Sequence, residues 1–107
     1  MALTRDFMVT VRARAVRDDE FRVGLLQEAI ECFLEGEVGA GKEILRVYIN
    51  ASMGFEKLAK KVGTPSKSLH RMFSDRGNPS ANTVFTVLAA LQKAERLAPD
   101  VRLKAAA

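Results

Sequence analysis

The sequence has a single cysteine, a single histidine and no long run of apolar residues. Cys32 has no partner within the chain for a disulfide, which is typical of proteins in a reducing compartment. One Cys and one His are too few for the usual four-ligand zinc site, and we expect neither a metal nor a cofactor. No apolar segment approaches the ~18 residues that cross a bilayer. The first residues, Met1 to Asp6, lack the pattern of a signal peptide, so we expect a cytoplasmic protein without a membrane partner.

One segment has almost the spacing of a phosphate-binding loop. Gly36, Gly41 and Lys42 match G-x-x-x-x-G-K, but Glu43 stands where Ser or Thr would hold Mg²⁺. A glutamate-rich helical pattern precedes the loop, in place of the buried strand that such loops follow. We therefore interpret these glycines as a turn between two helices and expect no nucleotide there.

No set of residues indicates an enzyme. His70 has no Cys, Asp or Glu at an obvious partner spacing, and Cys32 lies within an apolar helical stripe, where it is most simply a small core residue. The acidic pair Glu28 and Glu31 falls on a polar helix face. No nucleophile, base and orienting residue occur together in the sequence. We expect no catalytic residue.

The charge is divided unevenly along the chain. Residues 1–37 contain five Arg against eight Asp or Glu, whereas residues 38–107 contain twelve Lys or Arg against five Asp or Glu. A basic segment of this kind is typical of proteins that bind the phosphate backbone of nucleic acids. The acidic segment suits a basic protein partner, and it suits equally a role in keeping a DNA-binding protein soluble.

Apolar periodicity predicts an all-α fold, since no alternation typical of strands occurs. With 107 residues, of which 48% are hydrophobic, the chain suits a single domain with a packed core. Thr4 is a plausible N-cap for a first helix over about 4–16, and Asp18 caps a second that continues to Gly36. A third helix spans about 40–50. Ser80 can cap a last helix, in which Val84, Val87, Leu88 and Leu91 lie at i, i+3, i+4 and i+7. We divide the chain into an N-terminal helical extension (1–36), a DNA-binding domain (37–96) and a tail (97–107).

Residues 54–73 predict two short helices joined by a tight turn. The apolar residues Phe55, Leu58, Ala59 and Val62 lie at i, i+3, i+4 and i+7, and Gly63 then ends the helix. Thr64 is the expected N-cap of the next helix and Pro65 its first residue. In that helix Leu69, Met72 and Phe73 continue the apolar stripe. Ser66, Lys67, His70 and Arg71 occupy the opposite, basic face, as a helix that reads the major groove requires.

Ala59, Gly63 and Leu69 also carry a resemblance to the phage-repressor (XRE-like, Cro-type) helix-turn-helix. The likeness continues through Gly77-Asn78-Pro79 and through Thr83-Val84-x-x-Val87-Leu88-x-Ala90-Leu91. This order and spacing, over roughly residues 36–93, resembles the addiction-module antidote branch, the HigA-like antitoxins. The resemblance implies a five- to six-helix DNA-binding core, usually a homodimer. It also implies repression of the protein's own promoter and neutralisation of a RelE/ParE-type toxin.

The resemblance assigns roles to residues of this sequence. It implies that Ser66, Lys67, His70 and Arg71 read the operator, with Lys67 and Arg71 four residues apart as the best candidates for guanine or phosphate. Phe55 departs from the family, which often has a phosphate-contacting Gln at this position. Phosphate contacts then fall to the backbone N–H groups at this helix start and to Lys57, Lys60 or Lys61. The residues that follow the helix pair and are expected at the DNA backbone are Asn78, Ser80 and Asn82.

Three hypotheses remain open at this point. The chain is an autoregulating antitoxin, a phage-type regulator that binds DNA without a toxin partner, or a protein-interaction module that uses the acidic N-terminal helices. A dimer is expected because one helix-turn-helix covers few base pairs. Its interface is either a pairing edge at Val101-Arg102-Leu103 or the apolar surface of the last helix.

Overall fold

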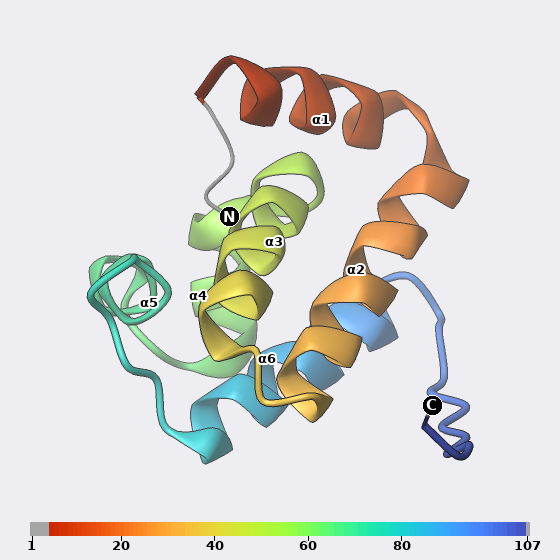
Figure 1. Ribbon diagram of the computed structural model, residues 1–107. Helices are drawn as coiled ribbons and strands as arrows, with labels where there is room; N and C mark the ends of the chain where they lie inside the picture. The colour runs from red at the N-terminus through yellow and green to blue at the C-terminus, as the bar shows by residue number, and fades with distance from the viewer. Residues whose placement is uncertain (1–4, 107) are drawn as a thin grey trace.

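The computed structural model describes residues 5–106, which form six helices and no strand. This confirms the predicted all-α fold. In chain order the helices are α1 (Arg5–Arg17), α2 (Asp19–Leu34), α3 (Val38–Ala51), α4 (Gly54–Val62), α5 (Ser66–Met72) and α6 (Ala81–Ala94). In Figure 1, α1 runs across the top, α2 descends beside α3, and α5 lies at the opposite side from α2.

The third helix is the centre of the fold, because it packs against α1, α2 and α4. Its residues Leu45, Tyr48 and Ile49 are fully buried, at the i, i+3, i+4 spacing of one helix face. The core continues into α4 and α5 through Leu58 and Leu69. The second helix packs against both α1 and α3. The α4–α5 pair is therefore mounted on a core that it shares with the rest of the protein.

Two of the predicted helix caps are present. The Asp18 side chain accepts a hydrogen bond from the Phe21 N–H at 3.0 Å, and this bond is the main reason why the pKa of Asp18 is lowered. Ser80 Oγ accepts a hydrogen bond from the Thr83 N–H at 3.1 Å at the start of α6. The third helix begins at Val38, two residues before the predicted start. Thr4, the expected cap of α1, lies outside the described residues.

The turn between α4 and α5 has the predicted glycine and a different cap. Gly63 adopts a left-handed conformation, with φ 71° and ψ 30°, which costs little without a Cβ. The N–H groups of Gly63 and Thr64 both donate to the Ala59 carbonyl, at 2.9 and 3.2 Å. The expected Thr64 cap was wrong. Pro65 is the N-cap residue, and no side chain caps α5, because the chain stays extended for one residue longer.

The segment after α6 contains neither helix nor strand up to residue 106. Val101-Arg102-Leu103, one of the two alternatives for the dimer interface, forms no strand within the single chain. Val101 and Leu103 are exposed in an irregular segment. Within residues 5–106, no helix has both the length and the hydrophobicity to cross a membrane.

Candidate nucleic-acid interface

The fifth helix presents a basic face to solvent because its other face is anchored in the core. Leu69 and Phe73 are fully buried, four residues apart. Lys67, His70 and Arg71 are exposed, at the i, i+3, i+4 spacing of a single helix face. Ser66 is half-buried, at the beginning of the helix. The four residues predicted to read DNA therefore lie on one accessible helix.

The two long cationic side chains of this face have no partner within the described part of the protein. The side chains of Lys67 and Arg71 make no hydrogen bond or ion pair with another described residue. Because they are unpaired, both cations are available to an external anion or base edge without breaking an internal contact.

His70 is held differently, by an aromatic stack. Its imidazole lies on the ring of Phe55, with ring centroids 4.1 Å apart and an angle of 28° between the ring planes. Phe55 is only 4% exposed, since it is packed into the core at the first turn of α4. Phe55 of α4 therefore contacts a residue of α5 directly.

The three lysines of α4 do not form one group. Lys57 and Lys61, four residues apart, line an open cleft of about 550 Å³. The same cleft is lined by Tyr48 and Glu95, which come from α3 and from the end of α6. Lys60 is exposed and does not line this cleft. We therefore separate Lys60 from Lys57 and Lys61 as candidates for a phosphate contact.

An ion-pair network closes one wall of this cleft. The Arg22 guanidinium donates to the Glu95 carboxylate at 2.8 and 2.9 Å and to the Ala15 carbonyl at 3.0 Å. The Tyr48 hydroxyl donates to the other oxygen of Glu95. Burial, followed by the hydrogen bond to Glu95, raises the pKa of Tyr48. The network thus joins α2, α3 and the end of α6, and it occupies the Glu95 carboxylate.

The three residues predicted to contact the DNA backbone after α5 lie around the start of α6. Asn78 and Asn82 are exposed. Ser80 is exposed too, but its oxygen caps α6, and its hydroxyl donates to Thr83 Oγ1 at 3.0 Å. Ser80 therefore already has a structural role, whereas the two asparagine side chains have no hydrogen-bond partner among the described residues.

Sequence reasoning missed two residues that fix the turn after α5. Lys42 Nζ donates to the carbonyls of Ser74, Asp75 and Gly77 at 3.1, 3.4 and 2.5 Å, and Lys42 is only 6% exposed. One helical turn later on α3, Arg46 donates to the Phe73 carbonyl at 2.5 Å and to Asp75. The basic residue of the near-match to a phosphate loop therefore binds the protein's own carbonyls.

The turn also depends on a glycine. A Cβ at Gly77 would lie 2.1 Å from the Arg71 carbonyl oxygen and 2.3 Å from that of Met72, which are backbone atoms that cannot rotate away. The turn therefore folds back closely against the end of α5. Together with Lys42 and Arg46, it fixes where the basic face of α5 points.

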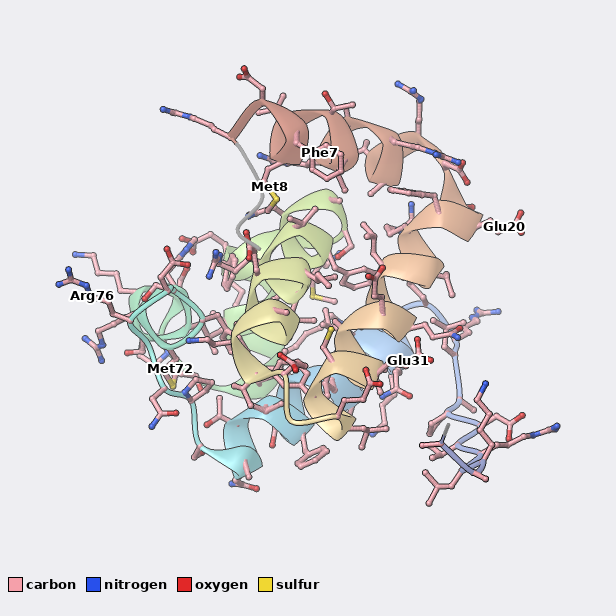
Figure 2. All side chains as sticks on the ribbon, in the orientation of Figure 1. Phe7, Met8, Glu20, Glu31, Met72 and Arg76 are labelled. Atoms are coloured by element: carbon pink, nitrogen blue, oxygen red, sulfur yellow. The ribbon has the colours of Figure 1, made fainter. Side chains whose placement is uncertain are left out.

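The charge of the molecule is separated in space as well as in sequence. Residues 54–78 contain six Lys or Arg and two Asp or Glu, and one of the acids, Asp75, is paired with Arg46. Figure 2 shows Arg76 at the edge of the molecule beside α5, whereas Glu20 and Glu31 lie on α2 at the opposite side. An anion that approaches the α5 side therefore meets mainly positive charge.

Comparison of the chain with protein-family models, with curated proteins and with solved structures finds no match.

Proposed function

We propose that the chain is a sequence-specific DNA-binding transcriptional regulator that reads the major groove with α5. The observation that carries this proposal is the exposed basic face of Lys67, His70 and Arg71 on a short helix whose other face is buried. A short helix that follows a tight glycine turn is a geometry that enters the major groove in many regulators. Lys and Arg reach guanine O6 and N7 there, and they also bind phosphate.

Residues around α5 supply the sequence-independent part of the affinity in this proposal. Lys60, Arg76 and Asn78 are exposed and contact the phosphate backbone on the two sides of the helix. Lys57 and Lys61, which line the cleft, contact the phosphate backbone only from that side of the protein. Each phosphate neutralised by a Lys or Arg releases counterions, so the affinity falls as the salt concentration rises.

The active species in this proposal is a homodimer that pairs through α6. Residues 77–92 contain no charged residue, although 28% of the whole chain is charged. Phe85 is 60% exposed within this segment, and Ala81 and Ala89, one turn before and after it, are exposed as well. Exposed aromatic residues without neighbouring charge are typical of interface cores, and an uncharged face is compatible with a second copy of itself.

We further propose that the regulator is of the antitoxin type, with α2 as the surface for a basic toxin. Glu28, Glu31 and Glu35 are exposed and form no ion pair with another described residue. They surround Cys32, and burial together with these carboxylates raises the pKa of its thiol. This unpaired acidic surface also favours the second candidate function, a protein-interaction module without DNA. A basic partner that co-purifies with the chain would support either version.

The two functions are distinguished by DNA binding at low salt. Fluorescence anisotropy with a labelled fragment of the protein's own promoter is expected to show saturable binding that is tighter than to a scrambled fragment. The slope of log affinity against log salt is expected to be negative, by about 0.9 for each phosphate contact. Absence of binding to either fragment at low salt would exclude the regulator and leave the interaction module.

A further inference from the structure

The stack between Phe55 and His70 connects the buried first turn of α4 to the exposed face of α5. We propose that Phe55 is a positioning residue that orients His70, and that His70 reads one purine of the operator. The inference rests on the proposed DNA binding and extends it to a specific contact. It also explains what an apolar residue does at this position of α4.

The geometry leaves the useful part of the imidazole free. In a stacked pair with 28° between the planes, Phe55 covers one face of the histidine ring. Both nitrogens of an imidazole lie on the ring edge, so they remain accessible on an exposed residue. A rotation of the ring away from Phe55 would give up the contact between the two aromatic rings. The stack therefore limits the directions in which the nitrogens point.

The restrained imidazole of His70 is better suited to distinguish base pairs than the side chains of Lys67 and Arg71. Lys67 and Arg71 have long side chains without internal partners, and they lose rotamer freedom when they bind. His70 has already lost much of this freedom in the stack. One imidazole N–H matches the N7 acceptor that every purine presents in the major groove, and guanine offers O6 beside it. We therefore assign the discrimination of one purine to His70, whereas Lys67 and Arg71 contribute affinity through guanine or phosphate.

The stack itself is tested without DNA. The chain contains a single histidine, so in protein without a histidine tag the imidazole C–H signals in an NMR spectrum belong to His70 alone. Because these protons lie over an aromatic face, we expect them upfield of their positions in the unfolded chain. Phe55→Met keeps most of the volume without the ring and is expected to return them downfield. The matched control Phe33→Met on α2 is expected to leave them in place. Unshifted signals in the wild-type protein would overturn the proposal.

The reading of a base is tested with a set of operators that differ at single base pairs. Phe55→Met and His70→Ala are each expected to reduce discrimination at the same base pair by about tenfold, and the double variant no further. Partial unfolding lowers the active fraction for every operator equally, so the ratio between operators separates positioning from stability. Unchanged ratios in Phe55→Met, with wild-type binding intact, would overturn the role of Phe55 alone. If the wild-type protein binds no DNA at all, the proposed function fails together with this inference.

Discussion

Lys42 Nζ lies 2.5 Å from the carbonyl oxygen of Gly77, across 35 positions of sequence. The same ammonium donates to the carbonyls of Ser74 and Asp75, so one buried cation binds three oxygens of the turn that follows α5. Carbonyls in a tight turn have no helical partner and need donors from elsewhere. Together with Arg46, this side chain of α3 fixes the end of the proposed recognition helix.

Replacement of Lys42 tests the importance of this contact. Lys42→Met keeps the aliphatic stem but removes the donor, and we expect it to lower the free energy of unfolding by about 2 kcal/mol, because the carbonyls lose a charged partner. Urea denaturation measures this loss. The control Lys93→Met on the exposed side of α6 is expected to change stability by less than about 0.5 kcal/mol. Equal effects of the two substitutions would show that the buried ammonium of Lys42 does not stabilise the fold.

Gly77 and Gly24 are expected to respond in opposite directions to alanine. At Gly77 the new methyl group would lie 2.1 Å from a backbone oxygen, so Gly77→Ala should destabilise by about 1–3 kcal/mol. Gly24 is in the interior of α2 with no atom within 4 Å of an added Cβ, and Gly24→Ala should stabilise by about 0.5–1 kcal/mol. Thermal unfolding of both variants gives the comparison. A neutral Gly77→Ala would mean that the turn does not pack against α5 as described.

Tyr48 is the only tyrosine of the chain, so its ionisation is measured directly by absorbance. Its pKa is raised above the ordinary value of 10.0 by burial and by the Glu95 carboxylate. The folded state thus favours the protonated phenol. The resulting stabilisation is fully present below pH 10.0 and is lost as the pH rises above it. We expect the phenolate band to appear at higher pH in the folded protein than in urea. Coincident titrations would contradict the buried network.

Phe85 tests the proposed dimer. A lysine at this position places a charge in the centre of the uncharged α6 face of both copies, so Phe85→Lys is expected to yield a monomer. Sedimentation velocity distinguishes the two states. Val9→Lys, on the exposed side of α1, provides a matched control that should remain a dimer. A monomeric wild-type protein, or a Phe85→Lys variant that still dimerises, would move the interface elsewhere or remove it.

Local sequence patterns were sufficient to predict that the chain folds into helices. Apolar periodicity and two short polar caps, Asp18 and Ser80, predicted where α2 and α6 begin, because these signals act within one turn of the chain. The left-handed conformation of Gly63 was also predicted from a local signal, the glycine at the end of an apolar helical pattern. Thr64 failed as a cap, because an extended Pro65 takes the N-cap position and shifts the start of α5 by one residue.

The contacts that shape the candidate site could not be predicted from local sequence patterns. Lys42 reaches residues 32 to 35 positions away, and Phe55 stacks on a histidine 15 positions later. These pairs meet only after the helices have packed, so nothing in their local sequence indicates the partner. Periodicity predicted that Lys67 and Arg71 share an exposed face. It did not separate Lys57 and Lys61, in the cleft, from Lys60.

The most direct test of DNA binding through α5 is the affinity of three alanine variants for the protein's own promoter. Lys67→Ala and Arg71→Ala are each expected to weaken binding by about 1–3 kcal/mol if the lost contact is to a base. If the lost contact is to a phosphate, the salt slope is expected to become shallower by about one. Arg12→Ala, on the exposed side of α1, is expected to bind like the wild type. Unchanged affinity and salt slope in both α5 variants would contradict the account.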